Sequence, residues 1–241
     1  MDINKIINEA VNEELTKKGY IKNKKNHDKP KNSLLKESYS LTVNKFDLKT
    51  ELLTDKNKSA HQELLENYVK KTNEVSAKLD GVERSDANLN HSNYRSLKID
   101  ESYNHNAVFL HSLYFENISD LNSQITTDSL AYMRLTRDFG SFEEWQEDFI
   151  ACAMSARNGW VITGYNIYLG RYVNTIIDLH SENVMIGVIP IVVLDCWEHA
   201  YYRDYLSARK KYVHAMMKEL NWDIIEARTE KSELISKAMR K

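Results

Sequence analysis

The chain has 241 residues, of which 42% are apolar and 28% charged, and its formal net charge is −2. These values are typical of a globular protein with a full core, and they give no general signal for nucleic acid or acidic ligands. No apolar run approaches a membrane span, and the first residues lack the apolar core of a signal peptide. We therefore expect no membrane or nucleic-acid partner and a cytoplasmic location, with Cys152 and Cys196 as buried, reduced thiols.

Residues 1–40 are predicted to be an N-terminal extension. Residues 2–19 carry a short amphipathic pattern, typical of a helix that docks on another surface. Residues 20–37 are rich in Lys and Asn, which predicts a solvated linker. The alternatives for this stretch are a basic arm that touches an anionic partner and a disordered tail.

Residues 41–122 are predicted to form a helical-hairpin domain. Residues 38–55 are expected to be extended or irregular. A long helix follows, because apolar residues recur at intervals of three and four until Asp80-Gly81 ends the pattern. We expect a polar loop over residues 82–100 and a second helix over residues 100–117. The apolar side of that second helix carries Tyr103, Ala107, Val108, His111, Tyr114 and Phe115.

Residues 123–241 are predicted to form a C-terminal α+β domain. Residues 130–137 are helical, and a capping box of Ser141 and Glu144 begins the next helix. Three β-strands are expected over residues 160–163, 172–178 and 186–194, and helices again from residue 198 to the end. The predicted fold class is therefore α+β, with a long α-helical hairpin before a three-stranded antiparallel sheet flanked by helices.

Asp195 and His199 stand four residues apart, at the boundary between the last predicted strand and a helix. If the strand ends near Asp195, both side chains can face one point. A carboxylate and an imidazole that converge there suit a first-row transition metal such as iron or manganese. The alternative readings are a strand-end cap for Asp195 and a buried core histidine for His199.

The residues around this pair resemble the C-terminal signature of the iron/manganese superoxide dismutases. Asp195 to Tyr202 read D-x-W-E-H-A-Y-Y, and Asn221 to Arg228 read N-W-D-I-I-E-A-R. Upstream, Phe139 to Trp145, Asn158-Gly159-Trp160 and His111 to Asn117 are similar to further family motifs in the same order. The resemblance covers roughly residues 58–230.

This resemblance implies one iron or manganese ion per subunit, bound by three histidines and one aspartate. Asp195 and His199 match the two C-terminal ligands, and His111 matches the ligand on the second hairpin helix. His61 is the only histidine of the first hairpin helix and takes the fourth place. Zinc is disfavoured because it cannot perform the family's redox step.

The sequence departs from the family pattern at residues around the ligands. His61 precedes Tyr68, the counterpart of the tyrosine at the site entrance, by seven residues instead of eight. A helix without a π-bulge would absorb the difference. The family's second histidine on this helix is replaced by Leu64 or Leu65. The glutamine that bonds the metal's solvent is also missing, and His180 is our candidate for its role.

The resemblance further implies the activity and the assembly. Two superoxide anions would be converted to dioxygen and hydrogen peroxide, with Tyr68 and His180 steering protons and Arg209 drawing in the anion. Glu198, which reaches the metal-bound histidine of the other subunit in the family, implies a homodimer in which Glu198 and His199 meet near Tyr202. The alternative function is a superoxide-dismutase-like structural or assembly component with weak or no activity, tethered by residues 1–40 to a larger particle.

Overall fold

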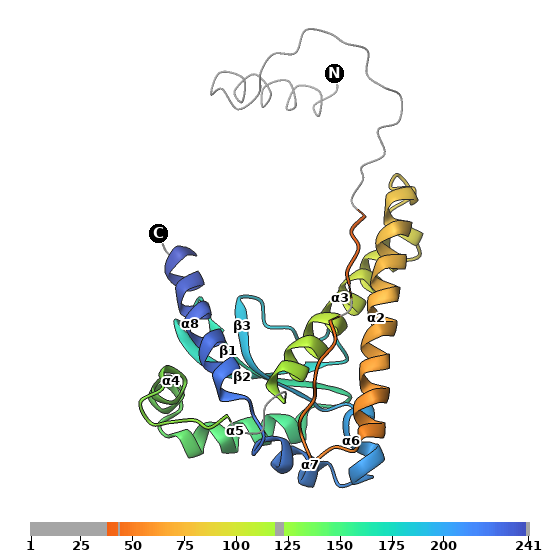
Figure 1. Ribbon diagram of the computed structural model, residues 1–241. Coiled ribbons are helices and arrows are strands. Elements are labelled where there is room, and N and C mark those ends of the chain that lie inside the picture. The colour runs from red at the N-terminus through yellow and green to blue at the C-terminus, as the bar shows by residue number, and fades with distance from the viewer. Residues whose placement is uncertain (1–37, 43, 119–122, 240–241) are drawn as a thin grey trace, which may run out of the picture. The chain divides into compact units, whose positions relative to one another are not determined.

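The computed structural model describes residues 38–42, 44–118 and 123–239 (Figure 1). The amphipathic pattern and the Lys/Asn-rich stretch predicted before residue 38 lie outside these residues. Residues Lys36–Lys241 form one compact unit, which contains every element described below. Among the described residues, no helix combines the length and the apolar character needed to cross a membrane.

A long helical hairpin comes first, as predicted. Helix α2 (Asp55–Gly81) begins at Thr54, whose side chain accepts a hydrogen bond from the backbone N–H of Asn57. Helix α3 (Asn93–Asn117) packs along α2 (Figure 1). The predicted start of α3 at residue 100 was wrong. The helix begins seven residues earlier, at Asn93, where Ser92 caps it. Residues 93–102 are mostly exposed, so they carry no apolar stripe to reveal the helix.

The irregular segment before α2 runs along that helix and is held by its polar side chains. The backbone N–H of Tyr39 donates to the Ser76 hydroxyl at 2.7 Å. The side-chain amide of Asn73 bonds both the N–H and the carbonyl of Leu41, at 2.7 and 3.0 Å. These bonds satisfy backbone groups that have no strand partner, so the segment is ordered without forming secondary structure.

Within residues 123–239, the structure has five helices and three strands. The elements are α4 (Leu130–Phe139), α5 (Phe142–Ser155), β1 (Gly159–Asn166), β2 (Arg171–Asp178), β3 (Val188–Asp195), α6 (Glu198–Tyr205), α7 (Arg209–Met216) and α8 (Trp222–Met239). The strands form one antiparallel sheet in the order β2-β1-β3, which confirms the predicted fold class. Both cysteines are free thiols. Cys196 is buried as predicted, whereas Cys152 is only partly buried.

The sheet joins the hairpin to the C-terminal helices. Its central strand β1 is buried along its whole length. Helices α3 and α8 pack on β3, α5 packs on β1 and β2, and α6 packs on α2. Strand β3 ends at Asp195 and α6 begins at Glu198, and these two elements meet the open end of the hairpin, near the start of α2 and the end of α3. This meeting point is where the predicted functional residues gather.

Candidate metal centre

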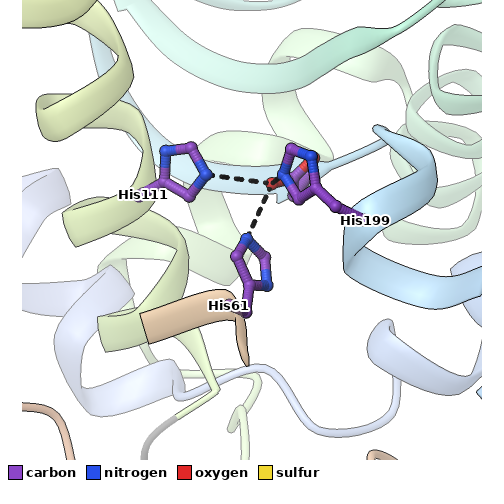
Figure 2. A group of neighbouring side chains, drawn as sticks. His61, His111 and His199 are labelled. Atoms are coloured by element: carbon purple, nitrogen blue, oxygen red, sulfur yellow. Dashed lines mark hydrogen bonds and ion pairs between the residues drawn. The ribbon is translucent and has the colours of Figure 1, made fainter. Parts of the chain in front are cut away.

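Four side chains from four elements converge on one point. His61 comes from α2, His111 from α3 and His199 from α6, and Figure 2 shows their three imidazoles pointing toward one another. Asp195, the last residue of β3, supplies the carboxylate between them. Its Oδ2 atom lies 3.2 Å from Nε2 of His61, 3.1 Å from Nε2 of His199 and 3.7 Å from Nε2 of His111. One ligand atom from each of the four residues lies within 4.8 Å of all the others.

The Nε2 atom of His111 faces the point where the four ligand atoms converge. Its Nδ1 lies 2.6 Å from the carbonyl oxygen of Ala107, so this nitrogen carries the proton and donates it. Its Nε2 is buried and has no hydrogen-bond partner among the described residues. A buried acceptor of this kind is costly to leave unpaired. A carbonyl that orients a histidine in this way is the usual support of a metal ligand, so the residues present fit a bound transition metal.

Two hydrogen bonds hold Asp195 in place and leave its Oδ2 atom to the imidazoles. The backbone N–H of Trp197 donates to Oδ1 of Asp195 at 2.8 Å. The Tyr212 hydroxyl donates to the Asp195 carbonyl oxygen at 2.8 Å. These two bonds orient the end of β3, and the carboxylate is fully buried. The expected convergence of Asp195 and His199 is therefore confirmed, and its cause is the strand end that precedes α6.

The electrostatics of the site favour the protonation states that metal ligands need. Burial alone would raise the pKa of Asp195, but the neighbouring imidazoles of His199 and His61 hold it well below its usual range. Burial lowers the pKa of His61 and of His111. One ionised carboxylate beside neutral imidazoles is the state that binds Fe²⁺ or Mn²⁺ without releasing protons first.

Tyr68 and His180 lie together beside the four convergent residues. The Tyr68 hydroxyl is 2.9 Å from Nε2 of His180, and the Tyr68 ring centroid is 5.3 Å from that of His111. The indole N–H of Trp160 donates to Nδ1 of His180 at 3.0 Å. His180 is fully buried, and burial lowers its pKa to about 4, so its ring is neutral near pH 7.

The seven-residue spacing of His61 and Tyr68 follows from a regular helix. Helix α2 is α-helical at every residue from Asp55 to Gly81, without a π-bulge. Seven residues are close to two full turns, so Tyr68 lies on the same face as His61, about 10 Å further along the axis. The position of the family's second histidine is apolar here, and Leu65 packs in the core.

The remaining predicted residues lie around the site. Nε and Nη2 of Arg209 are buried and have no hydrogen-bond partner among the described residues. The Arg209 side chain interacts with the Cys196 thiol and with Tyr201 rather than with Tyr68 or His180. Glu198 and Tyr202 are exposed on α6.

Two residues of the site were not predicted from the sequence. Asn106 donates through its side-chain amide to the His180 carbonyl at 3.0 Å and so holds the loop that carries His180. Tyr103 packs edge to face against the His180 ring, with centroids 4.7 Å apart. Both lie on α3 within eight residues of His111. In the sequence, only their spacing from His111 indicated that they could lie near the site. For Tyr103, the same spacing is equally typical of an ordinary core residue.

Comparisons with known proteins give the family. The family model described as "Iron/manganese superoxide dismutases, C-terminal domain" matches residues 127–228, which include Asp195 and His199 but neither hairpin histidine. The iron superoxide dismutase of Aquifex pyrophilus is 38% identical over 168 residues, which are 68% of this chain and 78% of that protein. The chain belongs to the iron/manganese superoxide dismutase family. A manganese member from Haloferax volcanii is 35% identical over 131 residues, 54% of this chain and 65% of that protein, so both metals occur among the relatives of this superoxide dismutase.

Proposed function

We propose that this protein is a superoxide dismutase with one iron or manganese ion per chain, bound by His61, His111, Asp195 and His199. The observation that carries the proposal is the buried Nε2 of His111, which has no hydrogen-bond partner among the described residues and lies beside the other three ligand atoms. Two superoxide anions and two protons give dioxygen and hydrogen peroxide, through the one-electron redox chemistry that either metal supplies when bound. The ligand set itself does not distinguish iron from manganese.

The surrounding residues prepare the site for this reaction. Ala107 and Trp197 hold a histidine and the aspartate in fixed orientations, which lowers the reorganisation needed for binding. Tyr68 and His180 place hydrogen-bonding groups beside the ligands, where protons must be delivered. Arg209 adds a positive charge near Cys196, and we assign it the role of attracting the superoxide anion.

The activity is tested on the full chain, purified metal-free and then loaded separately with iron, manganese or zinc. We expect superoxide removal with iron, manganese or both. The zinc-loaded protein is the matched control, because zinc suits nitrogen and oxygen ligands but has no redox chemistry. No activity with iron or manganese bound at the site would contradict the proposal and leave the structural or assembly role, which requires none of the four ligands.

We further propose that two chains form a dimer through Glu198 and His199, near Tyr202. Nδ1 of His199 is hydrogen-bonded to none of the described residues, and the His199 side chain is 26% exposed. Glu198 is exposed beside it, and Tyr202 is 51% exposed. An exposed carboxylate next to an imidazole N–H without an acceptor suits a reciprocal contact between two copies, since a two-fold interface repeats each contact.

Replacing Glu198 by alanine is expected to weaken the dimer. Loss of one partner of a buried, charged hydrogen bond costs about 2–5 kcal/mol of association free energy. Sedimentation velocity over a concentration series would measure the shift toward monomer. The matched control is Glu230→Ala, which removes an exposed glutamate on α8. Equal dimer affinities of the Glu198→Ala and Glu230→Ala proteins would contradict this interface.

A further inference from the structure

The protonation of His180 is fixed by its neighbour Trp160. An indole N–H can only donate a hydrogen bond, so Nδ1 of His180, which receives that bond at 3.0 Å, carries no proton. The proton of the neutral ring is therefore on Nε2. This nitrogen lies 2.9 Å from the Tyr68 hydroxyl, and its N–H must donate to the Tyr68 oxygen. The bond between His180 and Tyr68 thus has one direction.

This direction leaves the hydroxyl proton of Tyr68 without a partner at His180. That proton can therefore point to another acceptor, and the ring of Tyr103 lies next to that of Tyr68. The Tyr103 and Tyr68 ring centroids are 6.4 Å apart, and the pKa of Tyr68 is raised first by burial and then by the neighbouring Tyr103 hydroxyl. The Tyr103 ring also stands edge to face against His180, at an interplanar angle of 73°. Tyr103 therefore contacts both members of the pair that lies beside the ligands.

We propose that Tyr103 is a positioning residue for the reaction, whose hydroxyl accepts the proton of Tyr68 and whose ring supports His180. The series Trp160, His180, Tyr68 and Tyr103 then forms one line of hydrogen bonds with a single direction. It leads from the core, where Trp160 and His180 are fully buried, to the half-buried Tyr68 and Tyr103. Each proton in the line is fixed by the donor before it, so Tyr68 keeps one orientation toward the site.

Two substitutions separate the contributions of the hydroxyl and the ring. Tyr103→Phe keeps the ring against His180 and removes only the hydroxyl. Tyr103→Leu removes both. Tyr94→Phe is the matched control, because Tyr94 is another half-buried tyrosine on α3 and lies against Arg84 instead.

The first readout needs no metal and no activity. In metal-free full-length protein with ¹³C-labelled tyrosine and ¹⁵N-labelled histidine, Tyr103→Phe should shift the Tyr68 Cζ resonance, assigned by its absence in Tyr68→Phe. The ¹⁵N pattern of His180, with Nδ1 as acceptor and Nε2 protonated, should persist. Tyr103→Leu should shift the His180 signals as well. An unchanged Tyr68 resonance in Tyr103→Phe, matching that of Tyr94→Phe, would overturn the proposal.

The second readout rests on the proposed function. With metal content unchanged, Tyr103→Phe should lower the turnover number about tenfold, at the lower end of the effect of losing a supporting hydrogen bond around a metal site. Activity equal to that of Tyr94→Phe would overturn the positioning role. A wild-type protein that binds metal but removes no superoxide would instead refute the proposed function, and the resonance comparison would still decide whether the hydrogen bond exists.

Discussion

Replacing Asp195 by alanine is expected to abolish metal retention and superoxide removal. Among the described residues, Asp195 supplies the only carboxylate of the cluster, and its Oδ2 lies within 3.7 Å of all three histidine Nε2 atoms. Loss of a group that merely supports a ligand costs about 10–100-fold in metal affinity or activity. Loss of the ligand itself should exceed that range. Metal content after dialysis, followed by an assay of superoxide removal, measures both effects.

Asp195→Asn separates the loss of a ligand from damage to the fold. The amide oxygen can still accept the Trp197 N–H, and the backbone bond from Tyr212 is untouched. This variant should therefore fold like the wild type and still lose the metal, because the negative charge is gone. Asp100→Asn, at an exposed aspartate on α3, is the matched control. Wild-type metal content in Asp195→Asn would mean that the carboxylate is not a ligand.

Replacing Arg228 by alanine is expected to destabilise the fold by about 3 kcal/mol, since hydrogen bonds from a charged group each contribute about 1.5–3 kcal/mol and buried acceptors without a donor are costly. Arg228 on α8 donates to the carbonyl oxygens of Ile191 and Leu113 and to Oδ1 of Asn117, at 3.0–3.2 Å. It also forms an ion pair with Glu116 at 2.6 Å. The guanidinium thus joins α8 to β3 and to α3, which carry Asp195 and His111.

Denaturant unfolding of the metal-free and metal-loaded proteins would measure this effect as a lower midpoint. Arg228→Lys keeps the positive charge, but the lysine ammonium lacks the planar guanidinium fork and cannot reach all four acceptors. This variant should therefore recover only part of the lost stability. The matched control is Lys231→Ala, which removes an exposed charge from the same helix. If Arg228→Ala and Lys231→Ala unfold at the same midpoint, the bonds of Arg228 do not stabilise the fold.

The sequence predicted most of the architecture because most elements bury one face. Helix α2 was predicted from its three-and-four spacing and the three strands from short apolar runs between glycines, and apolar residues of all four elements lie in the core. The first turns of α3 were missed because they bury almost nothing. Hydrophobic periodicity marks a helix only where one of its faces is buried. An exposed helical segment that begins at a capping residue therefore cannot be predicted from periodicity.

The sequence predicted those parts of the candidate site whose residues are close together in the chain. Asp195 and His199 are close in sequence, so the strand end between them could be inferred. His61 and His111 lie on different helices, and only the resemblance to a family placed them near the pair. Tyr103 contacts His180 across 77 residues of chain, and a tyrosine at helical spacing on an apolar face has the same pattern as a core residue.

The metal content of the purified full-length protein tests the central claim most directly. Elemental analysis after expression with iron and manganese should find one ion of iron or manganese per chain. The same analysis of Asp195→Asn should find almost none, since only the four convergent residues form a cluster of potential metal ligands within the described part of the chain. A wild-type chain that stays metal-free after refolding with both ions would contradict the proposed site and, with it, the proposed enzyme.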